Sequence, residues 1–124
     1  MAENKKEKLE KILKSLDDIG DVLGSSIISS DGLSIASNLK EDADTEVIAA
    51  MTAAMHGAAE TAVSELKQGK LRQIIVDAEH GKMITISAGE KAILVILAKP
   101  QINLGLALLE LGKASGKISD ILGD

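Results

Sequence analysis

The sequence lacks cysteine, phenylalanine, tyrosine and tryptophan, and it has a single proline. Without cysteine it cannot form disulfides, use a thiolate nucleophile or ligate zinc or iron–sulfur clusters through sulfur. Without aromatic rings the core must consist of Ile, Leu, Val, Met and Ala, and modules that stack nucleobases on aromatics are disfavoured. No low-complexity stretch suggests a linker, so we expect one domain over residues 1–124, with residues 1–6 frayed.

The chain also lacks a block of basic charge and a long hydrophobic run. Its net charge is −5, and lysines alternate with acidic residues, so no basic stripe is available for nucleic acid. The charged start, MAENKKEKLEK, has no apolar region typical of a signal peptide. The longest apolar run, residues 92–98, is too short to span a bilayer. We therefore expect a cytoplasmic protein without direct membrane insertion.

A central helix is predicted over residues 44–68. The segment is rich in Ala, Met, Glu and Leu, which form helices readily. Asp44 and Glu46 place negative charge at its start, where the helix dipole favours it, and Gly69 follows as a stop signal. The rest of the chain is arranged around this helix.

Two apolar stripes run along the central helix. The first is predicted to rest on a sheet and comprises Ile48, Met55, Ala59, Ala62, Val63 and Leu66. The second lies about a quarter-turn away and comprises Val47, Met51, Ala54 and Ala58. Only a narrow strip is predicted to face solvent, around His56, Glu60, Ser64 and Lys67. A chain this short covers one face of a helix, so the second stripe indicates a partner interface; the alternative is that Met51 is an ordinary core residue and Ala a helix filler.

The remaining elements follow from periodicity and turn signals. A helix is predicted from residue 7 to Gly20, and another from the cap Asn103 to about Leu122. Five strands are predicted at residues 22–30, 33–38, 70–78, 83–88 and 91–99. The order αββαβββα predicts an α+β fold with a five-stranded antiparallel sheet. The central helix would cover one face and the two terminal helices the other.

Several segments together resemble the Roadblock family, named for the dynein light chain roadblock. They are ISSDGLSIAS (28–37), the Ala- and Met-rich helix (46–66), GKL (69–71), GEKAILVILA (89–98) and NLGL (103–106). The resemblance covers residues 7–122 and implies a small non-enzymatic platform with a profilin-like architecture.

The resemblance also implies an assembly and a partner. Roadblock proteins typically dimerise by pairing their third strands edge to edge and packing their second helices together. Bacterial and archaeal members are often associated with Ras-like small GTPases, as platforms or GTPase-activating partners, and eukaryotic relatives are dynein light chains or membrane-associated scaffolds. By position, the implied dimer and partner interface comprises Val47, Met51, Ala54, Ala58, Leu71, Gln73 and Ile75.

No catalytic, cofactor or metal site is predicted. The two histidines, His56 and His80, have no metal-ligand spacing and are interpreted as surface residues. Two acidic clusters lie at helix boundaries, where solvated loops are common, and neither has an EF-hand pattern. These clusters are Asp17, Asp18 and Asp21, and Glu41, Asp42 and Asp44. The sequence therefore predicts a protein that is not an enzyme.

Two further features bear on a GTPase partner. Residues 112–117 (GKASGK) lack phosphate-loop spacing, and Ile118 stands where a magnesium-binding hydroxyl would be, so the chain should not bind GTP itself. Its only arginine, Arg72, is predicted in the rigid edge strand, which is poorly placed to insert an arginine into the GTPase. Any stimulation of GTP hydrolysis would therefore work by reshaping the GTPase's switch regions.

The leading hypothesis is a prokaryotic homodimeric module that binds and regulates a Ras-like small GTPase, with stimulated GTP hydrolysis as one form of regulation. The alternative is a structural scaffold that pairs with itself or another Roadblock-like chain without contacting a GTPase. A third hypothesis, a ligand-sensing domain, requires a pocket with convergent polar groups, and the apolar strands offer few.

Overall fold

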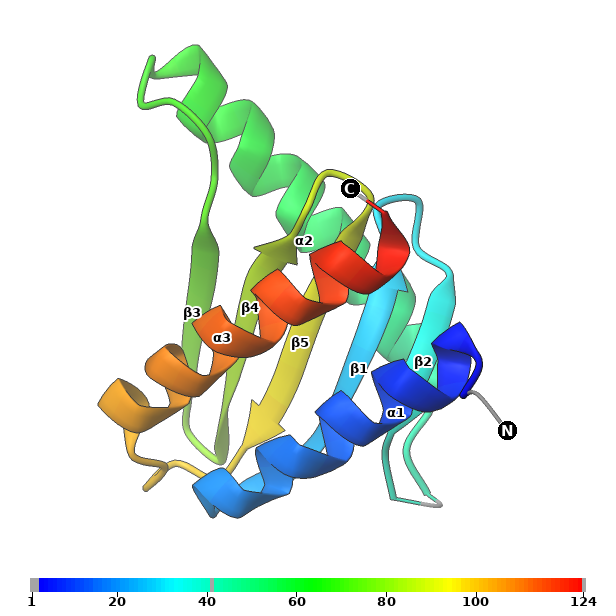
Figure 1. The fold of residues 1–124 in the computed structure, drawn as a ribbon. Helices are drawn as coiled ribbons and strands as arrows, with labels where there is room; N and C mark the ends of the chain where they lie inside the picture. Colours follow the sequence, from blue (N-terminus) through cyan, green and yellow to red (C-terminus); the bar gives the residue numbers. More distant parts are fainter. Residues whose placement is uncertain (1–2, 41, 124) are drawn as a thin grey trace.

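The structure, a computed structural model, describes residues 3–40 and 42–123 of the chain and has an α+β fold (Figure 1). The elements are α1 (Lys5–Ser15), the 3₁₀ helix η1 (Leu16–Ile19), β1 (Val22–Ser29), β2 (Ser34–Asn38), α2 (Thr45–Glu65), β3 (Gln73–Ala78), β4 (Gly81–Ala88), β5 (Ala92–Ala98) and α3 (Leu104–Leu122). This order confirms the αββαβββα prediction.

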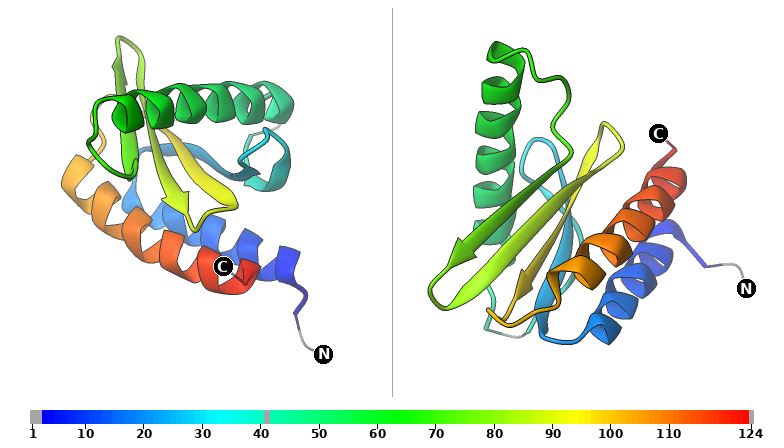
Figure 2. Two further views of the ribbon diagram at one scale, coloured as in Figure 1. Left: turned by 90° about the horizontal axis from the view of Figure 1, so that it is seen from above. Right: turned by 90° about the vertical axis from the view of Figure 1, so that its left-hand side faces the viewer.

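The five strands form one antiparallel sheet in the order β2-β1-β5-β4-β3. The apolar strand β5 is central, and pairs such as Ile27 with Leu94 and Ile84 with Ile96 hold its neighbours in register. Every residue of β5 except Leu97 is buried. A strand buried on both sides needs cover on both faces of the sheet, and α2 lies on one face with α1 and α3 on the other (Figure 2).

The main core lies between the sheet and the pair α1 and α3. Leu9 and Leu13 of α1 meet Leu111 and Ile118 of α3 over strand residues such as Ile84, and all five side chains are almost fully buried. The period of these apolar positions follows one face of each helix, which is why both helices lie flat on the sheet. This layer contains most of the large buried side chains.

The layer under α2 is thinner. Its buried apolar residues are Ile28, Ala49 and Ile93, with Ala53 packed against them. Asp44 caps the helix, since its carboxylate accepts hydrogen bonds from the amides of Glu46 and Val47 at 3.1 and 3.2 Å. The C-terminal end of α2 extends past the ends of the strands (Figure 1). The helix is therefore held to the sheet mainly through its first half.

Several boundaries differ from the sequence prediction; β4, for example, begins at Gly81 rather than at residue 83. Helix α1 begins at Lys5, because the side chain of Asn4 accepts a hydrogen bond from the Glu7 amide at 2.8 Å; the predicted fraying thus fails for Lys5 and Lys6, and residues 1–2 lie outside the described residues. Helix α2 ends at Glu65, three residues early. Strand β3 begins at Gln73 rather than at residue 70, after a connection with positive φ at Lys67 (58°) and Gly69 (88°).

Candidate interaction surface

The outer face of α2 carries the second apolar stripe on the exposed side of the helix. Val47 and Met51 are 54% and 59% exposed, and Ala54 and Ala58 are exposed as well. The small alanines leave room for another helix to approach, and the flexible Met51 side chain adapts to varied surfaces. We call the exposed Val47, Met51, Ala54 and Ala58 the α2 outer face.

Strand β3 forms an edge of the sheet. Within the described residues it pairs only with β4, so its other side presents backbone groups that no neighbouring strand pairs. Gln73 is exposed and Ile75 is 40% exposed. Leu71, which the sequence places in this strand, is half-buried in the connection before it. Figure 2 shows β3 at the sheet edge, with α2 on one face and α1 and α3 on the other.

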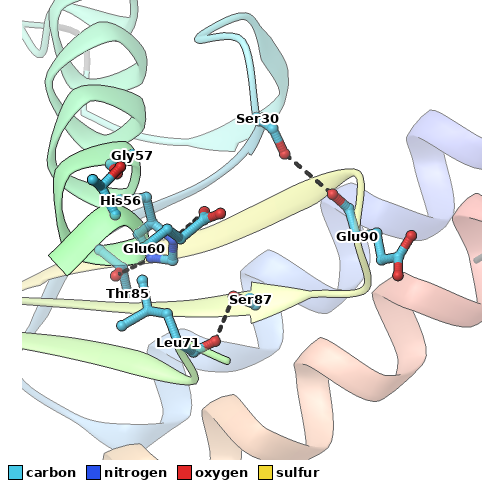
Figure 3. A network of polar contacts seen from close by, with 9 residues as sticks. Ser30, His56, Gly57, Glu60, Leu71, Thr85, Ser87 and Glu90 are labelled. Carbon is cyan, nitrogen blue, oxygen red and sulfur yellow. Dashed lines mark hydrogen bonds and ion pairs between the residues drawn. The ribbon is translucent and has the colours of Figure 1, made fainter. Parts of the chain in front are cut away.

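The predicted surface position of His56 is wrong. Its side chain is 1% exposed, and its Nε2 lies 2.6 Å from Oγ1 of Thr85 in β4 (Figure 3). Its Nδ1 lies 3.9 Å from Oε1 of Glu60. Burial lowers the pKa of His56, and the negative charge of Glu60 partly opposes this. His56 is therefore a neutral, buried side chain that joins α2 to the sheet.

The predicted sheet-facing stripe of α2 is also partly wrong. Ala49, Thr52 and His56 are the buried residues of the helix, whereas Ala62 and Leu66 of the predicted stripe are exposed. The other members, Ile48, Met55, Ala59 and Val63, are half-buried. The helix is rotated because the small Ala49 and Thr52 permit close approach to the sheet, and the hydrogen bond to Thr85 lets a polar His56 lie beneath it.

The remaining candidates show no assembled chemical site. His80 is exposed in the turn between β3 and β4. Within residues 3–40 and 42–123, no three His, Asp or Glu side chains are grouped to hold a metal; Glu41 of the second acidic cluster lies outside the described residues. Residues 112–117 lie inside α3, and Arg72 is exposed just before β3 rather than in it. None of the helices, in the part of the chain described, has the length and hydrophobicity needed to cross a membrane.

We predict that the lowered pKa of His56 makes stability depend on pH. Because the unfolded chain binds the His56 proton more readily, the stabilising effect of the neutral form is full above pH about 6.5 and is lost as pH falls through that value towards the folded pKa. Chemical unfolding at pH 8 and pH 5 measures this, with His56→Gln as the comparison. The charged group facing His56 is Glu60 of α2, and Thr85 faces it from β4.

The decisive quantity is the difference between wild type and His56→Gln in how the free energy of unfolding changes with pH. Both contain the same carboxylates, so their contribution to the pH dependence cancels in the comparison. His56→Gln should flatten the decline in unfolding free energy between pH 8 and pH 5. An unchanged decline would mean that His56 does not govern it.

Comparison with known proteins identifies a family and related sequences for this chain. Residues 8–98 match the model of the Roadblock/LC7 domain. An uncharacterized protein of Methanocaldococcus jannaschii, MJ0310, is 38% identical over 110 residues, covering 89% of this chain and 96% of that protein. The match over residues 8–98 includes α2 and β3, the two elements that carry the surfaces described above.

Solved structures share the architecture at low sequence identity. MglB of Myxococcus xanthus superposes with a TM-score of 0.87 at 19% identity, covering 94% of this chain and 95% of that one. A Roadblock/LC7 domain from Streptomyces avermitilis superposes with a TM-score of 0.87 at 16% identity, covering 93% and 98%. At these identities the likeness concerns the fold.

Proposed function

Because the chain belongs to the Roadblock/LC7 domain family, we propose that it acts as a homodimeric module that binds and regulates a Ras-like small GTPase. The observation that carries the proposal is the exposed apolar α2 outer face, present together with an open β3 edge. Covering an exposed apolar helix face removes apolar surface from water and so stabilises an assembly, and an unpaired strand edge is a template for another strand. A second copy of the chain supplies both.

In the proposed dimer the third strands pair edge to edge and the second helices pack together. Val47, Met51, Ala54 and Ala58 form the helix contact, and Gln73 and Ile75 belong to the paired strand. Leu71, in the connection before β3, lies at the margin of this contact rather than inside the ladder. The dimer would then present a continuous surface to a GTPase.

The GTPase partner is proposed from the family. Roadblock proteins of bacteria and archaea are often associated with Ras-like GTPases, and this fold is similar to that of MglB. The chain carries no phosphate loop, so the nucleotide would belong to the partner. The module itself is proposed to be non-enzymatic and cytoplasmic.

Affinity capture from an extract of the source organism tests the proposal. The tagged protein is incubated with GDP or with a non-hydrolysable GTP analogue, and bound proteins are identified by mass spectrometry. Enrichment of a small GTPase in one nucleotide state supports regulation. Recovery of only this chain or another Roadblock-like chain, in both states, would favour the scaffold alternative, which the same two surfaces also suit.

We predict that Arg72→Ala leaves any stimulation of GTP hydrolysis within about twofold of wild type. An inserted arginine accelerates hydrolysis by about 10³–10⁵, so its removal would be unmistakable. Phosphate release in single-turnover assays with the captured GTPase measures the effect. Loss of stimulation with unchanged binding would show that Arg72 acts on the phosphates and that reshaping of the switch regions is not the mechanism.

A further inference from the structure

Strand β3 has a regular backbone pattern along its free edge. The amide of Ser87 in β4 donates to the carbonyl of Arg72 at 3.2 Å, just before the strand begins. Residues of an antiparallel strand alternate between pointing their backbone groups to one side and to the other. The even-numbered residues of β3 therefore point theirs towards β4. The residues that point their amides and carbonyls to the free edge are Gln73, Ile75 and Asp77.

The side chains of these three residues lie on one face of the sheet. Ile75 pairs with Ile84 of the core under α1 and α3, and Gln73 and Asp77 share its face because side chains alternate along a strand. All three are exposed, and in order they are an amide, an aliphatic group and a carboxylate. Oδ1 of Asp77 lies 3.2 Å from Nζ of Lys82 in its own chain, and a carboxylate has further acceptor sites for a partner.

A second copy of the chain fits this edge in one antiparallel register. When a two-fold axis passes through Ile75, this residue meets its own copy, and each Gln73 meets the partner's Asp77. All three outward-pointing residues then join the ladder, with an aliphatic pair between two amide–carboxylate pairs. On the other face of the sheet, Ile74 meets the partner's Val76, and both side chains are apolar.

The neighbouring registers are poorer. An axis through Ile74 sets Ile75 against the partner's Gln73, and an axis through Val76 sets Ile75 against the partner's Asp77. In each case the aliphatic side chain faces a polar one, and one of the three outward-pointing residues is left outside the paired strands. A shift by a single residue opposes an outward backbone group to one that points towards β4, so no ladder forms.

The charges at the two ends of β3 favour the antiparallel direction. Lys70 and Arg72 precede the strand, and Asp77 and Glu79 lie at its end. Antiparallel copies bring the basic start of each strand to the acidic end of the other, whereas parallel copies would align like charges. The edge is therefore complementary in charge to itself.

The opposite edge of the sheet is less suited to pairing. Strand β2 has five residues, and its register with β1 shifts between Ile27 and Ile28, whereas β3 keeps one register with β4 over its whole length. Short strands and bulges protect a sheet edge from other chains. Pairing of β3 with β3 uses the same edge on both copies, so the assembly closes at two.

We propose that Gln73, Ile75 and Asp77 make the β3 edge specific for a second copy of this chain, bound antiparallel with Ile75 on the two-fold axis. The side-chain amide of each Gln73 donates to the carboxylate of the partner's Asp77, so this contact occurs twice in the dimer. A chain without an amide and a carboxylate at these positions lacks the match, so a copy is favoured over another Roadblock-like chain. This register presupposes the homodimer of the proposed function and adds to it the residues that select the partner.

Single cysteines test the register, because the chain has no cysteine of its own. Ile74→Cys, Ile75→Cys and Val76→Cys are oxidised separately, and the rate of disulfide-linked dimer formation is measured by mass spectrometry. Directly opposed residues have Cα atoms about 5.5 Å apart, within disulfide range, whereas diagonal positions are about 7–8 Å apart. Ile75→Cys should therefore crosslink fastest. Ser34→Cys, exposed on β2, is the matched control and should not crosslink.

Sedimentation equilibrium of the wild type separates the possible failures. A dimer whose variants crosslink fastest at Ile74 or Val76 would overturn the register and leave the homodimer intact. A dimer that crosslinks at none of the three positions would show that another surface pairs. A monomeric wild type would refute the register and the homodimer together. A failure to capture a GTPase affects none of these results, because they are obtained on the purified chain.

Charge changes at Gln73 test the selection of the partner. Gln73→Lys places an ammonium opposite the partner's Asp77, and Gln73→Glu places a second carboxylate there. The dissociation constant of the dimer should fall about two- to tenfold for Gln73→Lys and rise by a similar factor for Gln73→Glu, the effect of two exposed charge pairs. Ser34→Lys and Ser34→Glu change the net charge equally at the opposite edge and should stay within about twofold of wild type. Equal responses at the two positions would show that net charge alone acts and would overturn the selective role of Gln73 and Asp77.

Discussion

Replacing Met51 with glutamate is expected to dissociate the proposed homodimer. Met51 lies within the α2 outer face and is 59% exposed in the single chain, so packing of a second helix would bury it. A glutamate there would place an unpaired carboxylate in an apolar interface, and a buried unpaired charge costs several kcal/mol. We expect the dissociation constant to rise at least about a hundredfold, which corresponds to about 2.7 kcal/mol.

The measurement is sedimentation equilibrium with interference optics. The chain has no Trp or Tyr, so absorbance at 280 nm cannot follow it. Leu109→Glu is the matched control, because Leu109 is 56% exposed on α3, across the sheet from α2. Wild type and Leu109→Glu should sediment as dimers and Met51→Glu as a monomer. A dimer of Met51→Glu with wild-type affinity would exclude the α2 outer face as the interface.

The fold could be predicted because its signals are local. The apolar run of β5 indicated burial on both sides, and Asp31-Gly32 indicated the hairpin, where Gly32 indeed has a φ of 91°. The C-terminal end of α2 could not be predicted as accurately as these strands. Gly69 marked a turn, but the chain already takes a positive φ at Lys67, and a stop signal does not specify how many residues before it unwind.

The site could be predicted on one side of α2 only. The exposed stripe with Val47 and Met51 follows from periodicity, since a helix apolar on two sides cannot bury both in a small domain. The buried side of α2 does not follow from periodicity, because its key contact joins His56 to Thr85, which is 29 residues away. A hydrophobicity pattern treats Thr and His as polar, so it cannot show that a hydrogen bond across the sheet permits their burial.

Replacing Leu111 with alanine is expected to lower the free energy of unfolding strongly. Leu111 is fully buried in α3, within the core between the sheet and the two terminal helices. Its truncation removes apolar contacts and leaves a cavity that the surrounding close-packed side chains fill only in part. Substitutions of this kind cost about 2–5 kcal/mol. Urea unfolding followed by far-UV circular dichroism measures the change.

The comparison with Leu109→Ala isolates the core effect. Leu109 lies on the exposed side of the same helix, so its truncation should change the free energy of unfolding by less than about 0.5 kcal/mol. Both variants must be measured at one protein concentration, because association adds to apparent stability. A cost below about 1 kcal/mol for Leu111→Ala would mean that the α1–α3 layer is not the stabilising core. The expected cost instead places stability on the face opposite α2, which leaves the α2 outer face free to serve as an interface.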